Sequence, residues 1–199
     1  DALLEGVTIT HGAANASTGT SDTMSGGGMI NVSCSPTIAS CIFEENEAVA
    51  TSLNGGGAMS NLYSSSPRSV DCIFRNNTAS GPGGAILGHQ TSAIDVSGTL
   101  FEGNSADNGG AIWSGVDSPV TIDGCVFRGN HAGMDGGAMS LGNMTSTVGN
   151  SVFTGNGCEH MGGAIKLSAG TLQMTSCSFH GNSTEWFGGG AVHLSGTAG

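Results

Sequence analysis

Three aspartates, Asp71, Asp95 and Asp123, come nearest to a set that could cleave a polysaccharide. Such chemistry needs grouped carboxylates, often beside a Lys or Arg that stabilises developing charge, and Arg68 is the sole cation expected near this cluster. The aspartates lie three, six and four residues before the nearest following phenylalanine, so they occupy different places in the repeat described below. A polysaccharide-processing enzyme is therefore the alternative interpretation, and no residue is assigned as catalytic.

Thiol chemistry is the second possibility, because the chain has 6 cysteines. Four of them, Cys41, Cys72, Cys125 and Cys177, fall two residues before a phenylalanine, where a column of small, inert internal side chains is expected. Their spacing matches no zinc motif. If a disulfide exists, Cys34 with Cys41 is the first choice, because these residues flank one corner, and Cys41 with Cys72, stacked one coil apart, is the second. Neither a metal site nor a cofactor is predicted.

The charge balance excludes several classes of partner. The chain has 4 basic and 15 acidic residues, for a formal net charge of −11. Nucleic-acid phosphates and anionic membrane surfaces are bound by clusters of Lys and Arg, so neither partner is expected. No apolar run approaches the roughly 20 residues of a membrane span. The 36 glycines argue against a helical protein, since an interior glycine costs a helix roughly 1 kcal/mol relative to alanine.

Much of this glycine belongs to an internal repeat. A Gly-Gly pair followed by a small and then an apolar residue occurs seven times, at intervals of 26 to 29 residues. Glycine is favoured at corners where a side chain would obstruct the backbone or where φ must be positive. The turn glycines are Gly27 and Gly28, Gly56 and Gly57, Gly83 and Gly84, Gly109 and Gly110, Gly136 and Gly137, Gly162 and Gly163, and Gly189 and Gly190.

A second motif, Phe-x-x-Asn, alternates with the first and uses six of the seven phenylalanines. The phenylalanines are expected to stack as an internal column. The asparagines are expected at a sharp corner, since Asn tolerates left-handed backbone and its amide can bond the next amide in a ladder. The motif residues are Phe43, Phe74, Phe101, Phe127, Phe153 and Phe179, with Asn46, Asn77, Asn104, Asn130, Asn156 and Asn182.

Three short segments of each unit have strand character, as in residues 165–167, 120–122 and 125–127. No helical pattern is long enough to bridge parallel strands. The predicted fold class is therefore all-β: a right-handed parallel β-helix, or solenoid, of about seven coils with three strands in each coil of about 26 residues. Residues 1–199 are expected to form one domain, a segment of a longer chain, with residues 1–25 as a less regular first coil.

Stacked coils would turn equivalent positions into surface columns. The residue after each phenylalanine alternates in charge through Glu44, Arg75, Glu102 and Arg128, which predicts an exposed ion-pair ladder. The residue before each phenylalanine is apolar. This second column is either an exposed interface or a half-buried stripe on a twisted strand, and both interpretations stay open. Its members are Ile42, Ile73, Leu100, Val126 and Val152.

The loops before the Gly-Gly pairs form the variable edge, and they carry Trp186, Phe187, Asp107 and Asp135. Trp113 lies just past its own loop, on the strand. Insertions in repeat proteins map to one face, so a receptor or glycan is expected to bind at this edge.

The alternation of Gly-Gly-Ala-[Ile/Leu/Val] with Phe-x-x-Asn resembles the repeat of the chlamydial polymorphic outer membrane proteins, from about Gly26 to Leu194. This resemblance implies a surface-exposed β-helix with a role in adhesion. The preferred interpretation is a non-catalytic structural or adhesive module, extracellular or at the cell surface. Other subunits or neighbouring domains are expected to stack on its ends, because open β-helix ends carry unpaired strand edges.

Overall fold

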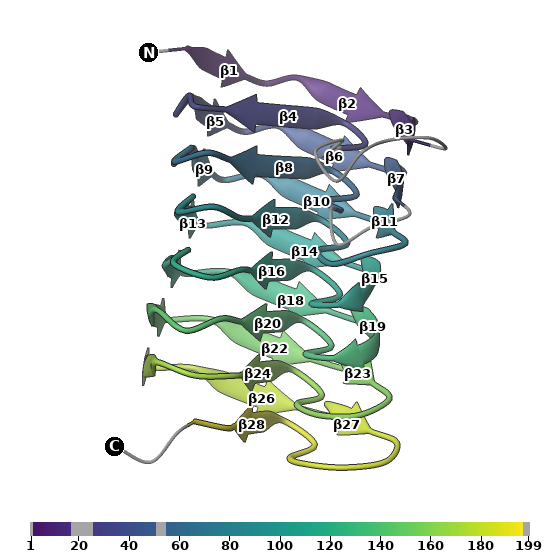
Figure 1. Ribbon diagram of the computed structural model, residues 1–199, viewed down its shortest axis with the longest axis vertical. Coiled ribbons are helices and arrows are strands. Elements are labelled where there is room, and N and C mark those ends of the chain that lie inside the picture. The colour runs from purple at the N-terminus through teal and green to yellow at the C-terminus, as the bar shows by residue number, and fades with distance from the viewer. Residues whose placement is uncertain (1, 17–25, 51–54, 197–199) are drawn as a thin grey trace.

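The strands form four parallel sheets of seven strands each, stacked around one axis (Figure 1). The computed structural model describes residues 2–16, 26–50 and 55–196. Each strand pairs with the strand four places further along the chain, which is its copy one coil on. Six complete turns separate β1 from β25, and β26–β28 add part of a seventh. The solenoid is thus slightly shorter than the seven coils predicted.

The four sheets are named A to D in the order in which the first coil visits them. Sheet A contains β1 (Leu3–Glu5), β5 (Thr37–Ala39), β9 (Arg68–Val70), β13 (Ile94–Ser97), β17 (Val120–Asp123), β21 (Thr145–Gly149) and β25 (Thr171–Thr175). Sheet B contains β2 (Thr8–Thr10), β6 (Ile42–Glu44), β10 (Ile73–Arg75), β14 (Leu100–Glu102), β18 (Val126–Arg128), β22 (Val152–Thr154) and β26 (Ser178–His180). Sheet C contains β3 (Ala13–Ala16), β7 (Glu47–Ala50), β11 (Thr78–Ala79), β15 (Ser105–Asn108), β19 (His131–Asp135), β23 (Gly157–Cys158) and β27 (Ser183–Thr184). Sheet D contains β4 (Met29–Val32), β8 (Met59–Leu62), β12 (Ile86–Gly88), β16 (Ile112–Ser114), β20 (Met139–Leu141), β24 (Ile165–Leu167) and β28 (Val192–Leu194).

Sheet C corrects the prediction of three strands per coil, because each coil has four. Its strands start right after the ladder asparagines, and several contain only two residues. The inward position is alanine in most coils and Cys158 and Thr184 in the last two, and Ala48, Ala79 and Ala106 form a small core cluster of their own. Alanine has low strand preference and gives no apolar alternation, so this sheet has little sequence signal.

The core of the solenoid is built around the phenylalanine column, which is confirmed. Neighbouring rings stack with centroids 4.7 to 5.1 Å apart and planes within 8° of parallel. Five of the six rings are fully buried, and Phe179 in the last coil is partly buried. The ring spacing is close to the distance between paired strands, so each ring packs directly on the ring of the next coil.

The ladder asparagines stand at the corner between sheets B and C, and their amides form the predicted ladder. The Nδ2 of Asn77, for example, donates to Asn104 Oδ1 (2.9 Å) and to the Phe43 carbonyl (2.9 Å). The same Asn104 Oδ1 accepts the Asn77 backbone N–H at 3.1 Å. The prediction of left-handed backbone at these asparagines is wrong. Positive φ falls on the residue before each of them, at Glu45, Asn76 and, in the next four coils, a glycine.

The Gly-Gly pairs use glycine for two different reasons. Gly109 has a φ of 61°, a conformation that residues with a Cβ rarely adopt. Gly110 has ordinary φ, but a Cβ there would collide with the carbonyl oxygen of Gly137 in the next coil. The first glycine therefore makes the turn, and the second lets adjacent coils approach.

The first coil is as regular as the others where the structure describes it. Strands β1, β2 and β3 pair in register with β5, β6 and β7. Residue 1 and residues 17–25, the remainder of the segment predicted to be less regular, lie outside the described residues. The described part of the chain has no helix of the length and apolarity that crossing a membrane would require.

Candidate functional site

The five apolar residues that precede the phenylalanines line the outer face of sheet B and are called the apolar column. Strand register places each beside its equivalent in the next coil. Ile42, Ile73 and Leu100 are half-buried, whereas Val126 and Val152 are 37% and 39% exposed. The column does point outward, and its exposure increases along the solenoid.

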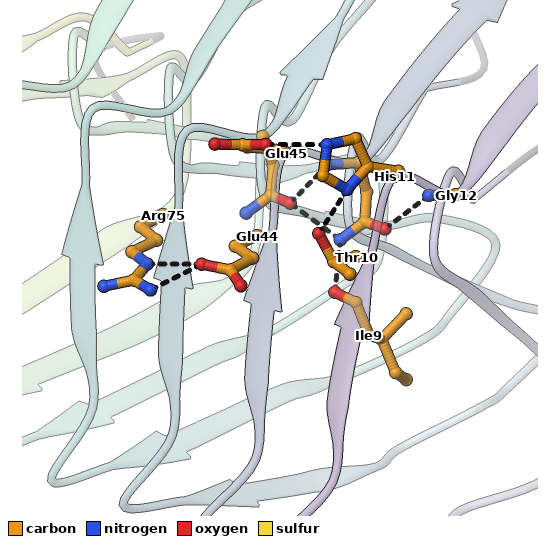
Figure 2. Close-up of polar contacts among 9 residues, drawn as sticks. Ile9, Thr10, His11, Gly12, Glu44, Glu45 and Arg75 are labelled. Atoms are coloured by element: carbon orange, nitrogen blue, oxygen red, sulfur yellow. Dashed lines mark hydrogen bonds and ion pairs between the residues drawn. The ribbon is translucent and has the colours of Figure 1, made fainter.

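The charged column beside it, after the phenylalanines, forms the predicted ion pairs. Glu44 Oε2 accepts hydrogen bonds from Arg75 at Nε (2.7 Å) and Nη2 (2.5 Å), as Figure 2 shows. Arg128 pairs with Glu102 through a single contact, from Nη2 to Oε1, of 2.5 Å. His11 and Glu45 add a contact of 2.9 Å at the adjacent corner. Exposed pairs of this kind contribute about 0–1 kcal/mol each, so their main effect is to fix the register and the net charge of the face.

The three aspartates of the enzyme interpretation occupy three different positions of the coil. Asp71 has a φ of 51° and forms the corner between sheets A and B, where the next coils have Gly98 and Gly124. Asp95 lies in the middle of β13 and faces Arg68 at 3.9 Å. Asp123 ends β17, and its Oδ1 accepts a hydrogen bond from Asn150 at 2.7 Å. Each carboxylate thus has a local role, and register does not align them.

The predicted thiol column lies inside, and its residues have a polar role that the sequence analysis missed. In each coil from Cys41 on, the side chain donates to the carbonyl two residues earlier, as Cys72 does to Val70 (3.3 Å) and Ser151 to Gly149 (2.6 Å). Cys, Thr and Ser are interchangeable here because each is a small donor. Burial raises the pKa of the Cys125 thiol to about 11, which keeps it protonated and unreactive at neutral pH.

The expected bridge between Cys34 and Cys41 is not formed, nor is the second choice, Cys41 with Cys72, and all three thiols are free. Cys41 is fully buried and donates to the Ala39 carbonyl at 3.2 Å. Cys34 is exposed after β4, on the outside of the corner. Cys41 points into the core and Cys34 lies at the surface, so flanking the same corner in sequence does not bring them together.

The variable edge carries one half-buried ion pair and a group of exposed apolar side chains. Lys166 Nζ lies 2.7 Å from Asp135 Oδ2, and each side chain is 17% exposed. Trp186 and Phe187 are 68% and 61% exposed, and Met134 two coils earlier is 40% exposed. Within the described ranges, no group of three or more His, Cys, Asp or Glu residues is placed to hold a metal ion.

A groove at the opposite end of the sheet D strands was not predicted. Trp113 of β16 and His89, just after β12, form one wall, with ring centroids 5.8 Å apart. The sequence did contain one sign of it. At the equivalent position of the other sheet D strands the residue is mostly small or aliphatic, whereas β16 has the large aromatic Trp113. The direction in which the indole leans could not be inferred from the repeat.

The stacked coils agree with a family match. A family model described as a right-handed β-helix region matches residues 62–199, well over half of the chain. The chain belongs to this family. The predicted right-handed parallel β-helix is thereby confirmed as to fold. Comparison with curated proteins gives no match, and comparison with solved structures gives none either. Right-handed β-helices serve many functions, so function has to be argued from the surfaces.

Proposed function

We propose that this β-helix is a non-catalytic structural or adhesive module, extracellular or at the cell surface, whose ends are covered by further coils or subunits. The observation that carries the proposal is the regular pairing of outward side chains from coil to coil. Charged residues on sheet B neutralise one another in the pairs Glu44–Arg75 and Glu102–Arg128. In each of these two pairs both charges have a structural partner one coil away, which suits a scaffold. The repeat's resemblance to the chlamydial polymorphic outer membrane proteins supports the surface role.

The ends of the described stack support the part of the proposal that concerns partners. Core residues of the last coil are only partly buried, among them Leu172, Phe179 and Val192. In the first coil, Leu4 and Ile9 are partly buried in the same way. A further coil would cover them and would extend the four sheets by strand pairing, as every internal coil does.

Electron microscopy and size-exclusion chromatography of the purified chain, over a range of concentrations, test this stacking. We expect end-to-end assemblies one solenoid wide. Leu172→Lys, which places a charge in the last coil, should shorten them, whereas Val126→Lys on the side of the solenoid should not. Dispersed single particles at all concentrations would contradict stacking.

The alternative, a polysaccharide-processing enzyme with a site near Asp71, Asp95 and Asp123, predicts a different result. Cleavage of a polysaccharide panel that is lost in Asp95→Asn, with the fold intact, would replace the non-catalytic proposal. The three separate positions of these carboxylates in the coil favour the structural interpretation.

A further inference from the structure

A groove of about 400 Å³ crosses the corner where sheet D turns toward sheet A, and its lining extends from His89 in one coil to Ser168 three coils later. This volume is within the range of small-molecule sites. Trp113 is half-buried, so part of its indole stays open to the groove. The position is distinct from the variable edge and from the outer face of sheet B.

Two glycines make room for the indole. A Cβ at Gly115 would lie 2.6 Å from His89 Cδ2 and 2.9 Å from Trp113 Cη2. A Cβ at Gly142, one coil on, would lie 2.5 Å from the Gly115 carbonyl oxygen. A side chain at Gly115 would push the ring away, and one at Gly142 would collide with the Gly115 backbone, so the absence of both lets the coils pack closely and the indole lie across the corner. The result is an aromatic wall beside a surface of bare backbone.

The polar groups of the groove are few and uncharged. Asn143 is exposed and its Oδ1 accepts the Asp117 backbone N–H at 3.0 Å, which leaves the amide nitrogen as a donor. Ser168 adds an exposed hydroxyl. His89 Nδ1 is buried and has no hydrogen-bond partner among the described residues. Burial lowers the pKa of His89, so the imidazole is neutral at pH 7. The lining contains neither Asp, Glu, Lys nor Arg.

We propose that this groove binds a neutral saccharide, with a sugar ring stacked on Trp113. A pyranose has an apolar C–H face and hydroxyls around its edge. The open indole suits the face, because the negative face of an aromatic ring attracts the weakly positive C–H groups. The Asn143 amide and the Ser168 hydroxyl, both exposed, suit the edge. A charged sugar has no ion-pair partner here, and the net charge of −11 repels acidic glycans. This inference goes beyond the structural role and does not depend on it.

The chain has two tryptophans, Trp113 and Trp186, which makes the proposal testable by fluorescence. In the full chain with Trp186→Phe, emission reports Trp113 alone. The probes are the neutral hexasaccharides of cellulose, laminarin, chitin and mannan, with hexagalacturonate as the anionic control. At least one neutral probe should change the emission saturably, and hexagalacturonate should not.

Calorimetry with the responding probe then compares variants whose fold is checked by circular dichroism. Trp113→Ala should raise Kd at least about tenfold, and Trp186→Ala should leave Kd unchanged. Asn143→Ala should raise Kd about threefold. Because Asn143 is exposed, this variant is expected to fold and still tests the site if Trp113→Ala does not fold. The proposal is overturned if no neutral hexasaccharide binds at about 10 mM, or if binding survives both Trp113→Ala and Asn143→Ala. Binding of an apolar peptide at Trp113, with no saccharide response, would overturn the ligand class.

Discussion

The two faces of sheet B repeat with the same period but differ in strictness. Inside, every coil from β6 to β26 carries phenylalanine at the same position, and an asparagine follows at the corner. Outside, the position next to the phenylalanine changes from Glu or Arg in four coils to Thr154 and His180 in the last two. Both columns have neighbours in perfect register. Strand register alone therefore does not restrict a position to one residue type. Burial does, because a buried ring or amide has neither water nor an alternative partner.

The largest difference between the faces should appear on removing one buried ring. Phe101→Ala leaves a cavity between two stacked rings and should lower the free energy of unfolding by about 3–5 kcal/mol. Chemical denaturation followed by circular dichroism measures this change. Thr154→Ala, at an outward position of the same sheet, serves as the control and should cost less than about 0.5 kcal/mol. Equal losses for the two variants would show that the inner column is not the core of the coil.

Removing one amide from the ladder should have the next largest effect. In Asn104→Ala, the backbone N–H and the amide of buried Asn77 both lose their acceptor, and the Phe74 carbonyl loses its donor. Buried groups without partners should lower the free energy of unfolding by about 2–4 kcal/mol. Asn143→Ala, which removes an exposed amide, should cost less than about 1 kcal/mol in the same denaturation experiment. A similar cost for both would mean that the ladder contributes little.

The buried thiols allow buried and exposed positions to be compared through the dependence of stability on pH. The pKa of Cys125 is about 11 in the folded chain, against about 8.5 for a free thiol. The folded state thus keeps a proton that the unfolded state releases, and stability is lost as pH rises from near 9 through 11. Cys125 should contribute about 2–3 kcal/mol to this loss, and Cys125→Ala should lack that contribution while it keeps those of Cys72 and Cys158, whose pKa values burial also raises. Denaturation at several pH values measures it. The exposed Cys34→Ala variant should keep the wild-type slope, and identical slopes in all three chains would contradict the prediction.

The smallest effect is expected on the outer face. Glu102→Gln removes the contact with Arg128 and should lower the free energy of unfolding by no more than about 1 kcal/mol, and by less at high salt. A double-mutant cycle with Arg128→Gln isolates the pairwise energy. A coupling energy above about 2 kcal/mol would mean that this exposed ion pair contributes as much as a buried one. The inner and outer faces of sheet B would then not differ in their contribution to stability.

Most of the solenoid was predictable because its constraints are local and repeated. The spacing of Phe101 and Phe127 specifies both the strand and its neighbour one coil on. Sheet C was not predictable, because Ala79 and Ala106 bury little area and leave no alternating pattern. The failed bridge between Cys34 and Cys41 and the unforeseen groove at Trp113 share a cause. Both depend on which way a side chain leaves the corner, and nearness in sequence does not fix that direction.

The asparagine ladder also gives the solenoid a direction. Each amide nitrogen donates to the amide oxygen of the following coil, from Asn46 to Asn77 and so on to Asn156 and Asn182, at 2.9 to 3.0 Å. Because all five bonds point the same way, their dipoles add along the axis. The last coil carries the final donor, the Asn182 amide, whereas the Asn46 oxygen at the other end of the ladder already accepts the Gly12 N–H of the first coil at 2.9 Å. An assembly that continues the parallel sheets from coil to coil grows as a polar fibre with every chain oriented alike, since a junction of two last coils would set two Asn182 amides against each other.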